Sequence, residues 1–289
     1  MRMIYVDEAG TSTRDAVLVV ASVLVEPDSQ YRVLEKKLGE IADERVPSQI
    51  RKGFHFHAKE LFNGGKQFSR DEWAFPDRLA TLKAILNLIR DHAIPVAFAA
   101  SLKQVDWSTV IAGLKEKRIT PEKWDHAIAF SQAMVKADLF LRKYLSGSEI
   151  GVVVAEDVTD RRELLRRVGL FARQAPYVLM PDQQHASSQD QAIGRSPPPS
   201  WIRIDHIVDD PHFMPKAGGP LLGLADAAAF TLRRCLERQP LGDDLLREML
   251  HPEDAEIFLS NEANFTSPAT SWILNTRAYW GLPFPSEFR

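Results

Sequence analysis

The sequence predicts an α/β fold in which helices cover both faces of one sheet. Continuous apolar segments of strand length, such as 16–25 and 151–155, are rich in β-branched residues and lack the alternation of a strand with one wet face. Segments with apolar residues at helical spacing separate them along the chain. The 289 residues are 45% apolar and 26% charged, which is typical of a chain that buries a large core. We therefore expect a globular protein rather than a disordered or fibrous one.

Five strands and five helices are expected along the chain. The strands are predicted at 3–6, 16–25, 95–101, 151–155 and 201–207. The last is predicted because Ile202, Ile204 and His206 alternate with polar residues. The helices are predicted at 30–45, 77–92, 121–145, 161–174 and 221–238. Pro121 is well placed in the first turn of the third helix, where its missing amide hydrogen is not needed.

The chain is expected to form one main domain over 1–240 and a C-terminal appendage over 241–289. The appendage holds apolar residues, Trp272 and Trp280 among them, that would dock it on the main domain. Within the main domain, 181–200 contains a triple proline and hardly any large apolar residue. This composition predicts a mobile surface loop.

Charge and cysteine content limit the possible environments and partners. The formal net charge of −3 excludes a global basic field, so a nucleic acid would have to meet a local patch or a bound metal. The single cysteine, Cys235, excludes an internal disulfide and favours a reducing compartment. The first residues do not resemble a secretory signal, and the longest apolar run, 16–25, is too short to cross a bilayer. We expect a cytoplasmic protein without membrane contact, and the oligomeric state is left open.

Two predicted strands end in paired acids, Asp7 and Glu8 after the first and Glu156 and Asp157 after the fourth. Sites in α/β sheets form at strand ends. Neighbouring like charges raise each other's pKa unless a cation neutralises them, and a divalent metal ion is the simplest such cation. The competing interpretation is that acids merely favour the loop at a strand exit.

A third acid, Asp226, lies in the helix predicted at 221–238. Its neighbours at helical spacing are apolar or small, so we expect it to face protein, where a carboxylate needs a partner. The small residues around it would let the helix approach the sheet and the strand-end acids. The alternatives are a position at the helix rim or a pair with Arg233.

The segment 53–61 supplies a fourth element. His55 and His57 would share one face of an extended chain, where they could bind zinc or have a structural role. Glu60 is the better candidate for Mg²⁺ or Mn²⁺, which prefer oxygen ligands. Asp125 in the helix at 121–145 is a rival to Glu60, and spacing alone does not choose between them.

Together these motifs resemble the domain-of-unknown-function 3800 family of the ribonuclease H-like superfamily. The motifs are Asp7-Glu8-Ala9-Gly10, Phe56 to Leu61, the acids after the fourth strand, and Val208-Asp209 before Leu224-Ala225-Asp226. The resemblance spans about 3–234. It implies a mixed five-stranded sheet flanked by helices and a metal cluster of Asp7, Glu60, Glu156 or Asp157, and Asp226. Ala9, Asp210 and Gly223 depart from the family, which usually has Ser, Ser and Gln there.

The function predicted from these residues is a divalent-metal-dependent phosphodiester hydrolase of the nuclease type. Two Mg²⁺ or Mn²⁺ ions would be bound by Asp7, Glu60, Glu156, Asp157 and Asp226, and the catalytic carboxylates would be Asp7, Glu60, Asp157 and Asp226. The nucleic acid substrate would be bound by His57, Lys59, Arg162 and Arg166. Supporting contacts to the ligands would come from Glu8, His55 and Asp209.

Two other functions compete with the nuclease. Ala9 and Gly223 favour a non-catalytic ribonuclease H-like module that binds nucleic acid or a protein partner. A zinc hydrolase that uses His55 and His57 is the third possibility, although the chain offers no clear third histidine for it.

Overall fold

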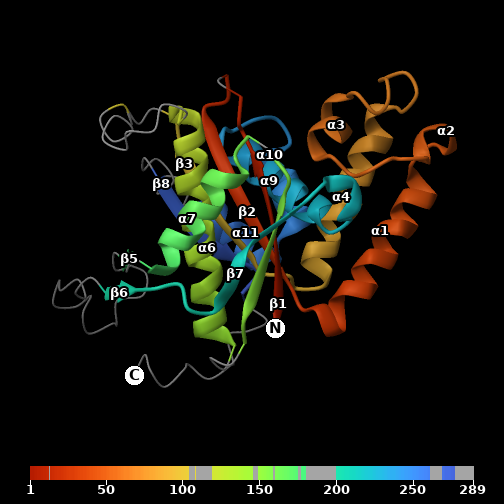
Figure 1. Cartoon of the computed structure of the whole chain (residues 1–289). Coiled ribbons are helices and arrows are strands. Elements are labelled where there is room, and N and C mark those ends of the chain that lie inside the picture. The colour runs from red at the N-terminus through yellow and green to blue at the C-terminus, as the bar shows by residue number, and fades with distance from the viewer. Residues whose placement is uncertain are drawn as a thin grey trace.

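The chain folds as an α/β structure around one six-stranded mixed sheet, as a computed structural model shows (Figure 1). The structure describes residues 1–12, 14–103, 108, 119–145, 149–158, 160–174, 177–179, 200–260 and 269–276. The mobile loop expected at 181–200 lies outside the described residues except for Ser200.

The strands of the main sheet are paired in both directions. Across the sheet their order is β7 (Ile207–Met214), β4 (Gly151–Glu156), β1 (Arg2–Ala9), β2 (Val17–Val25), β3 (Val96–Leu102) and β8 (Ala269–Leu274). The pairs of β1 with β4 and of β4 with β7 are parallel, and the others are antiparallel. All nine residues of β2 are buried, as its continuous apolar sequence predicts.

The sheet has six strands rather than the expected five, because β8 from the C-terminal region pairs with the edge of β3. The strand expected at 201–207 is also wrong. Residues Ser200–Ile202 form β6, which pairs with β5 (Tyr177–Leu179) in a separate ribbon, and the sheet strand β7 starts only at Ile207. The buried Asp138 carboxylate accepts the backbone N–H groups of 205–207, so sheet pairing begins at the end of that segment.

Helices cover both faces of the sheet, with α6 and α7 on one side and α1, α4 and α9 on the other (Figure 1). The helical elements are η1 (Pro27–Tyr31), α1 (Arg32–Arg45), α2 (Ser48–Arg51), α3 (Ala58–Asn63), α4 (Phe75–Asp91), α6 (Pro121–Tyr144), α7 (Arg162–Gln174), η3 (Lys216–Gly218), α9 (Leu222–Leu236), α10 (Gly242–Met249) and α11 (Pro252–Ser260). None of the helices in the described part of the chain is long and apolar enough to cross a membrane.

The central helix α9 is buried along almost its whole length, with only Leu236 partly open. It packs on β1 and β2 and is covered by α4 and α10. Its small residues permit this close packing: a Cβ at Gly223 would lie 3.1 Å from the Cβ of Phe56. The helix therefore brings any polar side chain near its N-terminal end against the sheet.

Candidate functional site

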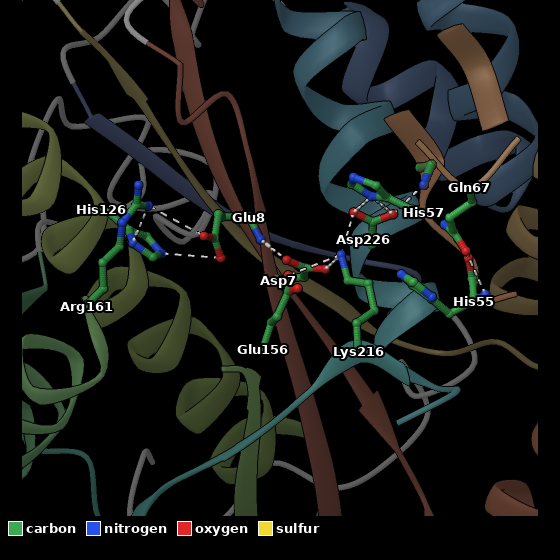
Figure 2. A network of polar contacts seen from close by, with 11 residues as sticks. Asp7, Glu8, His55, His57, Gln67, His126, Glu156, Arg161, Lys216 and Asp226 are labelled. Atoms are coloured by element: carbon green, nitrogen blue, oxygen red, sulfur yellow. Dashed lines mark hydrogen bonds and ion pairs between the residues drawn. The ribbon is translucent and has the colours of Figure 1, made fainter. Parts of the chain in front are cut away.

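Asp7 and Glu8, near the end of β1, lie on opposite faces of the sheet. Tyr5 belongs to the core on the α9 side, whereas Ile4 and Val6 belong to the core on the α6 side. Side chains alternate along a strand, so Asp7 follows Tyr5 and Glu8 follows Val6. Figure 2 shows the two carboxylates pointing apart, each into its own set of polar partners.

On the α9 side, three carboxylates converge on one ammonium group. Lys216 Nζ lies 2.8 Å from Asp7 Oδ2, 3.1 Å from Asp226 Oδ1 and 3.2 Å from Glu156 Oε2 (Figure 2). Val6 pairs with Ala155 in the parallel register, which places the ends of β1 and β4 side by side. We call Asp7, Glu156, Lys216 and Asp226 the acid–lysine cluster.

The cluster is nearly closed to solvent at its centre. Asp7 is 2% exposed, Asp226 is 5% exposed, and the Lys216 side chain is 8% exposed. Burial would lower the pKa of Lys216, but the charges of Asp226, Asp7 and Glu156 outweigh it and raise that pKa above its ordinary value. Lys216 is therefore a protonated cation in this structure.

Asp226 has a full set of partners. Its carboxylate accepts hydrogen bonds from the Ala58 N–H, from Lys216 Nζ and, at 3.2 Å, from His57 Nδ1. A carboxylate only accepts, so the Asp226 contact places the proton of His57 on Nδ1. Burial raises the pKa of Asp226, but Lys216, His57 and the Ala58 N–H together lower it to about 2.

Asp7 is less completely satisfied than Asp226. Its Oδ1 accepts the Glu8 N–H at 2.8 Å, but the buried Oδ2 accepts no well-aligned hydrogen bond among the described residues and has only the ion pair with Lys216. Burial raises the pKa of Asp7 well above its usual range; Lys216 opposes this, while Asp226, Glu8 and Glu156 add to it. The two buried acids thus have pKa values shifted in opposite directions.

The cluster opens into a cavity of about 210 Å³, which we call the acid cavity. His57 and Lys59 line it from the start of α3, and Gly10 lines it from the loop after β1. Gly10 has a φ of +88°, and a Cβ there would lie 2.0 Å from the Val17 carbonyl oxygen, so only glycine fits. Lys59 is exposed and has no ion-pair partner among the described residues, in contrast to Arg233, which pairs with Asp15.

On the α6 side, Glu8 meets His126 and Arg161. Glu8 Oε2 lies 3.5 Å from His126 Nε2, and Glu8 Oε1 lies 3.5 Å from an Arg161 nitrogen. Arg161 also lies 3.2 Å from His126 Nδ1, and because arginine can only donate, that nitrogen accepts. Burial lowers the pKa of His126, which agrees with this neutral form. We call Glu8, His126 and Arg161 the Glu8 cluster.

Some of the site residues expected from the sequence lie together in the structure, namely Asp7, Glu156, Asp226, His57 and Lys59. Other expected site residues lie apart from them. Asp157 forms a two-contact ion pair with Arg162. Glu60 accepts the Gln67 N–H at 3.1 Å, and the rival acid Asp125 lies on α6, across the sheet from Asp226. Neither Glu60 nor Asp157 lines the acid cavity.

The remaining expected contacts also lie elsewhere. Arg162 and Arg166 stack over the ring of Phe213 at 5.8 and 5.6 Å, outside the acid cavity. Asp209 is exposed, with a φ of +59°, where the register of β7 shifts against β4. His55 lies beside the cluster rather than in it, and its backbone pairs with the Gln67 side chain (Figure 2).

Lys216, the residue at the centre of the site, is not among the residues predicted from the sequence. It lies in 215–220, a short Pro- and Gly-rich connection between β7 and α9. The one available signal was a single cation in that connection, ten residues before the buried Asp226.

No three His, Cys, Asp or Glu side chains in the described part of the chain form a group arranged to hold a metal ion. The point where the carboxylates meet is taken by the Lys216 ammonium. The donor set still fits Mg²⁺ or Mn²⁺, because it consists of carboxylate oxygens and includes the buried Asp7 Oδ2.

Neither a protein-family model nor a curated protein nor a solved structure matches this chain. The resemblance to the domain-of-unknown-function 3800 family stays a prediction, and the functional conclusion depends on the site alone.

Proposed function

We propose that this protein is a divalent-metal-dependent phosphodiester hydrolase of the nuclease type with a ribonuclease H-like fold. The observation that carries the proposal is the convergence of Asp7, Glu156 and Asp226 on one buried cation position. The mixed sheet with helices on both faces supports the fold, since β7, β4, β1, β2 and β3 supply the five strands that it requires.

Asp7, Glu156 and Asp226 would hold the metal ion, with Asp7 at the centre because β1 pairs with β4 and also packs against α9. Bound Mg²⁺ or Mn²⁺ supplies activation of water and stabilisation of the charge that develops on a phosphodiester. Glu60 and Asp157, which have other partners, are not part of this proposed set.

His57 and Lys59 would act on the substrate from the wall of the acid cavity. Asp226 accepts the Nδ1 proton of His57, which orients the ring and leaves Nε2 to take up a proton, after which Nε2–H can donate to a phosphate oxygen. The His57 side chain is 31% exposed, so the ring is accessible from the cavity. Lys59, which has no ion-pair partner in the described part of the chain, supplies positive charge for the phosphate backbone.

The test is cleavage of single-stranded, duplex and hybrid nucleic acid by the purified protein with Mg²⁺ or Mn²⁺. Asp7→Asn is expected to abolish cleavage. The matched control is Asp43→Asn, which removes the same charge from a side chain that is 75% exposed near the end of α1. Equal cleavage by the wild type and Asp7→Asn would overturn the proposal, because it would locate the activity elsewhere.

One observation favours a second candidate, a non-catalytic binding module. Lys216 already neutralises part of the charge of the three carboxylates without any metal. The melting temperature, measured at increasing Mn²⁺ concentrations, distinguishes the two candidates. A nuclease site is expected to raise the melting temperature as it binds the ion, whereas a binding module is expected to show no response.

A further inference from the structure

Lys216 lies in the wall between two cavities. One is the acid cavity. The other has about the same volume, 210 Å³, and is lined by Glu35, Phe54, His55, Phe56, Lys216 and Gly219. We call it the His55 cavity. The residue that occupies the cation position therefore has an adjoining space on its other side.

A divalent ion and the Lys216 ammonium cannot share the position they both suit. Mg²⁺ binds carboxylate oxygens at about 2.0–2.1 Å, and Nζ now lies 2.8–3.2 Å from one oxygen of each carboxylate. Two cations in contact with the same oxygens also repel each other strongly in a buried site. Metal binding by these three acids thus requires Lys216 to leave them.

The His55 cavity offers an acceptor for the displaced ammonium. His55 Nδ1 is buried and accepts no hydrogen bond among the described residues. Figure 2 shows the His55 ring directed toward the Lys216 side of the site. Glu35 adds a carboxylate to the same cavity wall. An unpaired imidazole nitrogen and a carboxylate are suitable partners for an ammonium.

We propose that Lys216 is a built-in counter-cation, which holds the three carboxylates together in the metal-free protein and moves into the His55 cavity when a divalent ion binds. This inference rests on the proposed function, since it assumes that Asp7, Glu156 and Asp226 bind the ion. It makes Lys216 a competitor of the metal, so the protein binds Mn²⁺ less tightly than the carboxylates alone would.

The experiment is titration of the metal-free full chain with Mn²⁺, followed by the electron paramagnetic resonance signal of the free ion. Lys216→Met is expected to bind Mn²⁺ about 10-fold more tightly than the wild type. The matched control is Lys59→Met, which removes the same charge from the acid cavity without touching the carboxylates and is expected to change the affinity by less than about threefold.

A second variant tests the acceptor and does not depend on the folding of Lys216→Met. His55→Leu removes Nδ1 and is expected to weaken Mn²⁺ binding several-fold in the wild-type background. In the Lys216→Met background the same change is expected to have no effect, because no ammonium needs a partner there.

The outcomes separate this inference from the proposed function. Equal Mn²⁺ affinities of the wild type and Lys216→Met, or weaker binding by Lys216→Met, would overturn the counter-cation role while leaving the nuclease intact. An unchanged affinity in His55→Leu would overturn the move into the His55 cavity. If neither the wild type nor Lys216→Met binds Mn²⁺, the proposed function is overturned, and this inference with it.

Discussion

The adjacent acids Asp7 and Glu8 of β1 have different charged surroundings on the two faces of the sheet. On the α9 side, Asp7 shares one ammonium with two other carboxylates, so negative charge is in excess. On the α6 side, Glu8 is the one carboxylate among the described residues that pairs with Arg161, and a neutral histidine lies next to both. The Glu8 cluster is balanced, whereas the acid–lysine cluster can accept further positive charge. An excess of buried charge is typical of a site, whereas balanced charge is typical of structural support, so the excess on the α9 side distinguishes it even though Glu8 also borders the acid cavity.

The largest expected difference between the two faces of the sheet is in catalysis. Asp226→Asn is expected to lower cleavage by about 100-fold or more, because it removes a proposed ligand and the acceptor that orients His57. The measurement is kcat/KM on the best nucleic acid substrate, with Asp43→Asn as the control. Cleavage within a factor of two of the wild type would show that the α9 side is not the active face.

The next effect is on stability, which we expect to fall when the charge is removed on the α6 side but not when it is removed on the α9 side. Glu8→Gln is expected to lower the free energy of unfolding by about 1–3 kcal/mol, because it leaves the part-buried Arg161 without its carboxylate. Asp7→Asn is expected not to lower it, since burial and three neighbouring acids already disfavour that charge. Urea unfolding of the metal-free protein at pH 7 measures both. A larger loss in Asp7→Asn than in Glu8→Gln would reverse the comparison.

The smallest effect is the pH dependence of stability on the acid side. Asp226 has a pKa lowered from 3.8 to about 2, so its ionised form stabilises the fold above pH 4 and this contribution is lost as the pH falls toward 2. The difference corresponds to about 2 kcal/mol. Urea unfolding between pH 2 and pH 5 is expected to show this loss in the wild type and not in Asp226→Asn. Parallel pH profiles for the two proteins would contradict the assignment.

Much of the framework could be predicted from the sequence, because buried strands and amphipathic helices leave local patterns. The runs at 16–25 and 151–155 became β2 and β4, and the residue range 121–145 became α6 almost to the residue. The edge strands escaped prediction. In β7 the exposed Asp209 and Asp210 interrupt the apolar pattern at an irregularity in the pairing, and in β8 the polar residues Thr270 and Ser271 interrupt it.

The candidate site was only partly predictable for a related reason. The sequence predicts that Asp7 and Asp226 meet, because the end of a strand and the apolar surroundings of a helix position can both be recognised from neighbouring residues. The choice of Glu156 over Asp157 follows from the pleat, since Val154, two residues before Glu156, lies in the core on the α9 side. Glu60 was expected in the site, but α3 begins at Ala58 and Glu60 instead caps the loop at Gln67.

Hydrophobic periodicity and strand exits are properties of neighbouring residues, so the α/β class, the central strands and the acids at their ends can be predicted from the sequence. Which charges meet depends on the tertiary structure. Lys216 reaches Asp7, Glu156 and Asp226 from a short turn with no pattern of its own. Electrostatic partners are determined by distances through space, and the order of these four residues along the chain does not give those distances.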